Sequence, residues 1–534
     1  MSAAGSLARG AATITVATAL SRFTGFVRVV VVAAAMGTTF LANTYQTANT
    51  APNVVFELVA AGVLTSIFVP TFVDYLVKGR TEEGWDAANA LASVALVALV
   101  GLSALVALAA PWLMSALTIG VANGDLRARE IALGSTFLRL FAPQIAFYGA
   151  GMIMTGALHA HRRFGMAAVA PIFNNLVVIG VYVTYALMRG DRDPTVGGIT
   201  TGETVLLGLG TTAGVVAMTV CLIPPLSELG WRFRFRFDTK HPAVRRGARL
   251  GAWALGYAGG YQAGLIVVLL LANKVRGGVA AYQWAYTFFY LPHALFAIPI
   301  FHVLFTAMSE HVAKGEAPEF LERLRDGLAM LMFLLLPLAA FILVVATPLT
   351  RLTLEYGVMT GAGAEQVGRV LAAFAVGLPT YSTFLVYTRA YYALGDVKTP
   401  ALVNAASVVV SSAAGAVLFF WFPEDKAVAG LALGHSIGFA AGAFLLARRF
   451  AARQGPLGGT RLGSSIRRSM SVSIPAIAAM VLAEWALPEA TKFALVLNIA
   501  FTGMVGAAVY LVAMRLIASP ELARVGTLLS RSRP

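Results

Sequence analysis

Long apolar runs recur along the whole chain and constrain its fold more than any other feature. Each is long enough for a helix to cross the hydrocarbon core of a bilayer, where a helix satisfies all of its own backbone polar groups. Hydrophobic residues make up 58% and charged residues only 12% of the 534 residues, which is too apolar for a soluble surface. We therefore predict an all-α polytopic membrane protein with about fourteen transmembrane helices. The runs occupy residues 11–36, 41–76, 86–117, 130–158, 166–188, 203–225, 247–273, 277–308, 327–349, 366–394, 399–421, 427–447, 470–486 and 494–514.

The distribution of Lys and Arg predicts how these helices are oriented. The 40 Lys and Arg residues, against 25 Asp and Glu, give a formal net charge of +15, and the basic residues gather in every second connection, including residues 232–249 and 448–468. Because cytoplasmic loops are enriched in Lys and Arg, we expect the N-terminus inside, and an even helix count returns the C-terminus to the same side. The basic residues flank membrane spans and form no nucleic-acid module, so their charge does not indicate nucleic acid as a partner.

A weak internal repeat predicts the domain organisation. FAPQIAFYGAGMIMTGALHAHRRFG, from Phe141, aligns with FAVGLPTYSTFLVYTRAYYALGDVK, from Phe374. PNVVFELVAAGVL, from Pro52, aligns with PHALFAIPIFHVL, from Pro292, at nearly the same spacing. Parallel repeats of this kind predict two pseudo-symmetric six-helix lobes around a central cavity, residues 1–225 and 226–450. Residues 451–534 then supply two additional helices and a short cytoplasmic tail.

Two arginines interrupt the first apolar run. Arg22 and Arg28 lie within AATITVATALSRFTGFVRVVVVAAAMG, residues 11–37. Each costs about 2.5 to 3.5 kcal/mol at the centre of a membrane helix, so we expect an anionic group or a water-filled cavity to compensate them. A structural ion pair is the alternative for Arg22, and outward snorkelling for Arg28.

The second run carries a polar stripe. Its members fall within one narrow helical face at 100° per residue and are Asn43, Gln46, Thr50, Asn53 and Glu57. Glu57 is the natural counter-ion for an intramembrane arginine, either as a structural pair or as part of a transport path. We predict a substrate-binding set formed by Arg22, Arg28, Asn43, Asn53, Glu57 and Arg139, although Arg139 has the alternative of snorkelling outward.

Nothing in the sequence indicates catalysis, a metal or a cofactor. The single cysteine, Cys221, excludes an internal disulfide and a cysteine-cluster metal site. Residues 434–438, GHSIG, match the nucleophile-elbow pattern, but they lie in an apolar run and no histidine follows to complete a triad. The chain also lacks a Gly-Lys-Ser/Thr phosphate loop and a His-Glu-x-x-His motif. We expect a protein that is not an enzyme and that needs no cofactor.

An ordered set of motifs resembles the MurJ/MviN family, lipid II flippases of the multidrug, oligosaccharidyl-lipid and polysaccharide exporter superfamily. The motifs are SRFTGFVR (21–28), TAPNVVFELVAAGVLTSIFVP (50–70), ALHAHRRF (157–164), APIFNNLVVIG (170–180) and RAYYALGDVKTP (389–400). The resemblance implies a fourteen-helix protein of the bacterial cytoplasmic membrane. It would move undecaprenyl-pyrophosphate-linked peptidoglycan precursor to the outer leaflet by alternating access, with Arg22 and Arg28 meeting the pyrophosphate.

The resemblance also implies partners and leaves alternatives open. The expected partners are lipid II or a related polyprenyl-pyrophosphate glycolipid, membrane lipids, and proteins of cell-wall synthesis and division. One alternative is a flippase for another polyprenyl-linked glycan, and a different class is a membrane-embedded glycosyltransferase or lipid phosphatase. The chain departs from the family's usual charges at five positions: Val29, Asn43, Phe56, Ala61 and Thr287.

Overall fold

The fold is helical throughout the part of the chain that the computed structural model describes. That part comprises residues 3–63, 81–161, 163–231, 233–241, 244–245, 259, 262–455, 457, 459–487 and 491–523, and it contains no strand. Within it, twelve helices are long and apolar enough to cross a bilayer, which confirms the predicted all-α polytopic membrane fold. The second and seventh predicted spans, 41–76 and 247–273, fall partly outside the described residues.

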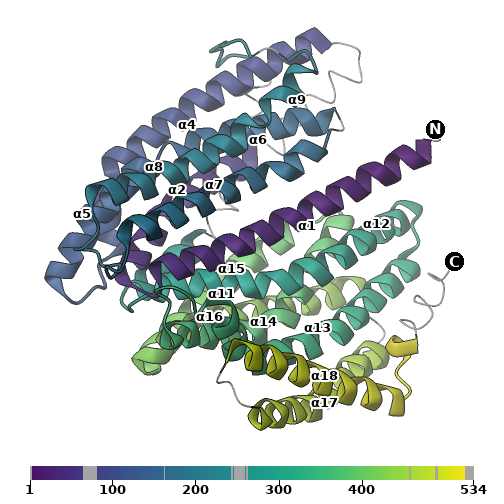
Figure 1. The fold of residues 1–534 in the computed structure, drawn as a ribbon. Helices are drawn as coiled ribbons and strands as arrows, with labels where there is room; N and C mark the ends of the chain where they lie inside the picture. Colours follow the sequence, from purple (N-terminus) through teal and green to yellow (C-terminus); the bar gives the residue numbers. More distant parts are fainter. Residues whose placement is uncertain are drawn as a thin grey trace. The chain divides into compact units, whose positions relative to one another are not determined.

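The chain forms two compact units (Figure 1). Unit 1 comprises Met1–Ala280 and Tyr356–Met359, and unit 2 comprises Ala281–Glu355 and Thr360–Pro534. The short segment belongs to unit 1 because the Val358 backbone N–H donates to the Ala34 carbonyl, at 3.0 Å. The division into two six-helix lobes and a two-helix appendage remains a prediction.

Unit 1 is built around the packing of its helices in pairs, among them α1 with α7, α7 with α8, α4 with α5 and α2 with α5. The predicted span 130–158 is in fact two helices that together cover Gly124–Ala160. They are separated at Pro143, which has no N–H to continue the hydrogen-bond ladder. The helices of unit 1 are α1 (Ala3–Met36), α2 (Phe40–Val63), α4 (Thr81–Leu117), α5 (Gly124–Phe141), α6 (Gln144–Ala160), α7 (Gly165–Arg189), α8 (Thr201–Val220) and α9 (Ile223–Ser227).

Unit 2 is also built of packed helices, and one of its spans contains an irregular turn. The span that begins with α11 (Gly278–Pro292), partly in unit 1, passes through a π-helical turn, η2 (His293–Ala297), directly after Pro292. Proline disrupts the regular ladder, and π turns commonly accommodate such a defect. The remaining helices are α12 (Ile298–Lys314), α13 (Ala317–Leu354), α14 (Gly361–Ala393), α15 (Lys398–Trp421), α16 (Glu424–Gln454), α17 (Gly459–Ala486) and α18 (Lys492–Leu516).

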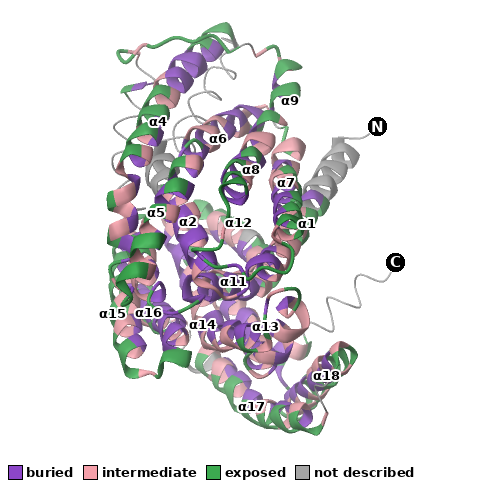
Figure 2. Ribbon diagram, turned by 60° about the vertical axis from the view of Figure 1, so that its left-hand side comes forward, coloured by how far each residue is buried: buried purple, intermediate pink, exposed green. Residues whose placement is uncertain are grey.

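Burial distinguishes central from peripheral helices in unit 2 (Figure 2). In the apolar 18-residue stretch of each helix, about 61% is buried in α14 and in α16. The buried share is only 28% in α15 and in α18, whose exposed apolar side chains suit contact with lipid. Residues 434–438, which match the elbow pattern only in sequence, lie inside α16, where Gly434 and Gly438 bring its backbone close to α15. Small residues at such a spacing allow membrane helices to pack tightly, so the motif serves packing.

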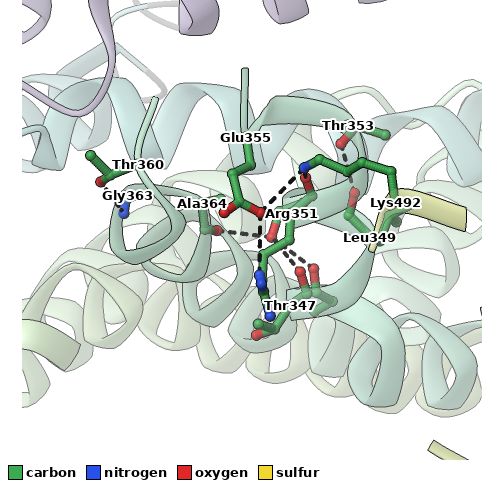
Figure 3. A network of polar contacts seen from close by, with 11 residues as sticks. Thr347, Leu349, Arg351, Thr353, Glu355, Thr360, Gly363, Ala364 and Lys492 are labelled. Carbon is green, nitrogen blue, oxygen red and sulfur yellow. Dashed lines mark hydrogen bonds and ion pairs between the residues drawn. The ribbon is translucent and has the colours of Figure 1, made fainter. Parts of the chain in front are cut away.

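The C-terminal helices α17 and α18 pack on α13. Polar contacts of two carboxylates, Glu355 and Glu521, lie at the two ends of this pair. Along their length, Val472, Ala476 and Met480 of α17 and Tyr510 of α18 form an apolar cluster with Phe333. At one end the Glu355 carboxylate accepts from Arg351 at 3.3 Å and from Lys492 at 3.2 Å (Figure 3). At the other end the Glu521 carboxylate, which is 7% exposed, accepts from the hydroxyl groups of Ser465 and Ser519 and pairs with Arg468.

Candidate functional site

The face of α1 that meets α7 carries Arg28. The Asn175 amide of α7 donates to the Ser21 carbonyl at 3.3 Å and to the Thr24 hydroxyl at 3.1 Å. Arg28 follows Ser21 by seven residues, which is almost two helical turns, so it lies on the same side of α1 and is half-buried. Arg22 is turned about 100° away from Ser21 and is exposed. The two arginines therefore occupy different environments.

Arg28 lies near a group of tyrosines. Tyr45 of α2, Tyr148 of α6 and Tyr182 of α7 all lie within electrostatic range of its guanidinium. Tyr45 is 2% exposed, shares a hydrogen bond of 2.5 Å with the Thr211 hydroxyl and packs its ring 5.6 Å from that of Tyr182. Among the described residues the structure gives Arg28 no carboxylate partner. A cation next to phenolic groups in an apolar unit is suited to an anionic ligand.

A cavity of about 230 Å³ adjoins this tyrosine group. Its lining comes from α6, α7 and α8 and includes Tyr148, Gly151, His159 and Pro171. The lining is mainly apolar, with Tyr148 linking it to the electrostatic field of Arg28. The described residues hold no group of three or more His, Cys, Asp or Glu side chains that would bind a metal ion.

Asn43, at the start of the polar stripe on α2, is committed to contacts within the protein. Its amide donates to the Val275 carbonyl at 2.8 Å, and its carbonyl accepts from the Val279 backbone N–H at 3.0 Å. The neighbouring Thr47 hydroxyl donates to the Asn273 side chain at 3.1 Å. This end of the stripe therefore holds the turn that precedes α11.

The other predicted residues make separate contacts in the structure. The Asn53 amide donates to the Asn49 carbonyl within α2, at 3.0 Å. The exposed Glu57 carboxylate accepts a hydrogen bond from Gln262, and its described contacts include no arginine. Arg139 is exposed in the last turn of α5. The structure thus joins Arg28 to a polar group of tyrosines and does not gather all six predicted residues into one described cluster.

Sequence reasoning missed Glu130. It is 1% exposed in α5 and accepts from the Thr44 hydroxyl at 3.3 Å, while its second carboxylate oxygen has no hydrogen-bond partner. The signal was present, because Glu130 shares a helical stripe with the buried residues Gly134, Phe137 and Phe141. A buried acid inside a membrane helix is usually functional, which makes Glu130 an additional candidate.

Comparison with known proteins identifies the family. A family model described as "Lipid II flippase MurJ" matches residues 32–506. The chain belongs to the MurJ family. A MurJ protein of Rhizobium meliloti (strain 1021), described as a probable lipid II flippase, is 28% identical over 419 residues, or 78% of this chain and 76% of the relative. The lipid II flippase MurJ of Burkholderia cenocepacia is 26% identical over 454 residues, or 82% and 83% of the two chains.

Solved structures show the same fold. A structure described as lipid II flippase MurJ in an inward closed conformation has a TM-score of 0.76 at 19% identity, covering 94% of this chain and 98% of that one. An inward-facing multidrug resistance transporter of the MATE family has a TM-score of 0.64 at 12% identity, covering 84% and 96%. The architecture is therefore common to MurJ and to a wider group of transporters.

Besides Asn43, whose contacts are given above, two of the five expected departures lie where the structure describes the side chain. Val29 is 8% exposed, so this position belongs to the packed face of α1. The Thr287 hydroxyl donates to the Gln283 carbonyl one turn earlier in α11, at 3.1 Å. The side chains of Phe56 and Ala61 lie outside the described residues.

Proposed function

We propose that this protein is a transporter that moves lipid II from the cytoplasmic to the outer leaflet of the bacterial cytoplasmic membrane by alternating access. The observation that carries the proposal is membership of the MurJ family over residues 32–506. The curated relatives described as lipid II flippases match more than three quarters of the chain, 78% and 82% in the two cases above.

Arg22 and Arg28 are the proposed contacts for the pyrophosphate. A guanidinium binds phosphate oxygens through two parallel hydrogen bonds and stays charged at any physiological pH. Arg22 is exposed and positioned for first contact, whereas Arg28 is half-buried beside the tyrosines, where a lower dielectric strengthens its attraction for an anion. Asn53, Glu57 and Arg139 are proposed to contact the cargo elsewhere along its path. Asn43 takes part by shaping the turn at Val275–Val279.

The proposed topology has both termini in the cytoplasm. It follows from the positive-inside pattern and from the even number of predicted spans. The chain offers a direct test because Cys221 is its only cysteine. In a Cys221→Ser background, single cysteines in the connections at 118–123 and 190–200 should react with an impermeant maleimide from outside. Cysteines in the 394–397 connection should react only after the membrane is opened, and the reverse pattern would overturn the orientation.

The function is tested by depletion. When the protein is removed, lipid II should accumulate in the cytoplasmic leaflet, while other polyprenyl-linked glycans keep their normal distribution. Accumulation of a different polyprenyl-linked glycan would instead support the alternative cargo. Normal distribution of every such lipid would contradict a flippase role.

A further inference from the structure

A second cavity lies at the end of unit 1 where α2 and α5 begin, and its lining includes charged side chains. Its volume is about 690 Å³, within the usual range of ligand sites. Its walls come from four separate segments: the start of α2, the first turn of α5, the α7–α8 loop and the turn before α11. The lining residues include Thr39, Asn123, Asp125, Arg129, Thr195 and Arg276.

We propose that this cavity binds the carboxylated glycopeptide headgroup of the cargo on the outer side of the membrane. The inference rests on the proposed function and topology, which place this end of unit 1 outside. It concerns a site different from the α1 arginines, and it assigns to unit 1 a contact made after the headgroup has crossed.

The charges of the lining favour an anionic ligand. Arg129 of α5 and Arg276 of the turn before α11 supply two guanidinium groups, against one carboxylate from Asp125. Guanidinium groups recognise carboxylates through paired hydrogen bonds. The first turn of the 18-residue helix α5 also lines the cavity and adds the positive end of its dipole. Asp125 is suited to a hydroxyl or amino group of the same ligand.

Several neutral polar groups of the lining are already used by the fold. The Thr39 hydroxyl donates to the Met36 carbonyl at 2.9 Å, and the Asn123 side chain accepts from the Leu126 N–H at 3.0 Å. We assign recognition mainly to Arg129, whose guanidinium lies against Gly197 in the cavity wall. Charged side chains distinguish this lining from that of the cavity beside Tyr148, which includes no Asp, Glu, Lys or Arg.

Hydrogen bonds hold the backbone of two of the walls. In the α7–α8 loop, Arg192 donates to the carbonyls of Met188, Arg189 and Gly198 at 3.1 to 3.3 Å. The loop ends in a capping box in which Thr200 and Glu203 each bond the other's backbone. The opposite wall is the turn fastened by Asn43, where Gly277, at φ 68°, lies too close to Thr38 for any side chain. A preformed site loses little freedom on binding.

Gly197 provides a way to disturb the site without removing a charge. A Cβ atom there would lie 2.4 Å from the Arg129 Nη1 atom, so Gly197→Ala must push the guanidinium aside. The guanidinium is the end of a flexible exposed side chain, so the fold should tolerate the shift. Gly165, in the first turn of α7, is the matched control, because a Cβ there meets nothing within 4 Å and the residue does not line the cavity.

The experiment uses the full-length protein in nanodiscs and two soluble probes, a disaccharide-peptide without lipid or phosphate, and inorganic pyrophosphate. Calorimetry should show that wild type and Gly165→Ala bind the disaccharide-peptide alike. Gly197→Ala and Arg129→Gln should bind it at least about tenfold more weakly, and Arg129→Lys should fall between. Thermal unfolding at the wild-type temperature confirms that each variant is folded.

Three outcomes would overturn the inference: no binding of the disaccharide-peptide, equal binding by the variants, or displacement of the peptide by equimolar pyrophosphate, which would indicate a general anion site. The depletion experiment separates this failure from failure of the proposed function. Lipid II accumulation on depletion, together with unchanged headgroup binding in Arg129→Gln, would leave the flippase role intact and remove only this site.

Discussion

Substitution of Asn43 gives the most direct test of the structure. Its side chain is fully buried and bonds the Val275 carbonyl at 2.8 Å and the Val279 N–H at 3.0 Å. Asn43→Ala leaves both backbone groups buried without a partner, at about 1 to 3 kcal/mol each. The expected loss is therefore about 2 to 6 kcal/mol, out of a total stability of about 5 to 15 kcal/mol for a typical domain.

The assay is equilibrium unfolding of the purified protein in detergent, followed by circular dichroism. Asn53→Ala is the matched control, because Asn53 is only half-buried and its one bond, to Asn49, stays within α2. This variant should lose less than about 1 kcal/mol. Asn43→Asp keeps the acceptor for Val279 but turns a carboxylate toward the Val275 carbonyl, so it should also destabilise the protein. If Asn43→Ala unfolds like wild type yet fails to support flipping, Asn43 contacts the cargo and the structural account is wrong.

Three further predictions follow from separate parts of the molecule. Arg22→Ala should insert at normal abundance but fail to complement a depletion strain, with partial rescue by Arg22→Lys; full complementation by the alanine variant would exclude a ligand role. Gly434→Ala places a Cβ 2.3 Å from the Gly415 Cα and should cost about 1 to 3 kcal/mol in thermal unfolding, whereas Gly101→Ala, with open space around it, should be neutral or slightly stabilising. Burial raises the pKa of the Asp396 carboxyl, but hydrogen bonds from Thr399 and Arg453 outweigh it and hold that pKa below its usual value. The stability that Asp396 contributes is thus present above about pH 4 and is lost as the pH falls through the lowered pKa, so the melting temperatures of wild type and Asp396→Asn should converge in acid and stay apart at neutral pH.

The positions of the helices were predictable because hydrocarbon leaves the backbone few alternatives. The predicted spans 399–421 and 366–394 lie close to α15 (Lys398–Trp421) and α14 (Gly361–Ala393). Helix ends were less accurate. The predicted span for α16 stops at residue 447, but the helix continues to Gln454. The prediction was too short because the last turns carry Arg448, Arg449 and Arg453, and a search for apolar runs excludes charged residues.

The site was harder to predict, because a polar stripe does not specify what it faces. Asn43 lies on such a stripe, and its partners are 232 and 236 residues away, in a turn that no local pattern connects to it. The helical spacing of Glu130 placed it on the buried face of α5. Its charge suggested instead that it belonged to a loop, because it lies at the end of the predicted span 130–158. The spacing of polar residues identified the polar helical faces. Only the three-dimensional contacts show which of these side chains form hydrogen bonds inside the protein and which are exposed.

The attachment of α17 and α18 to α13 has a consequence for biosynthesis. The Tyr510 hydroxyl bonds the Phe333 carbonyl across 177 residues, and Lys492 reaches Glu355 across 137. A chain is synthesised from its N-terminus, so α13 is made before α17 and α18. Until these last two helices emerge from the ribosome, the face of α13 that carries Phe333 lacks its contacts with them. A chain that terminates early would leave Glu355 without Lys492 and α13 without its neighbours. Completion of unit 2 is thereby a late event in the synthesis of the chain.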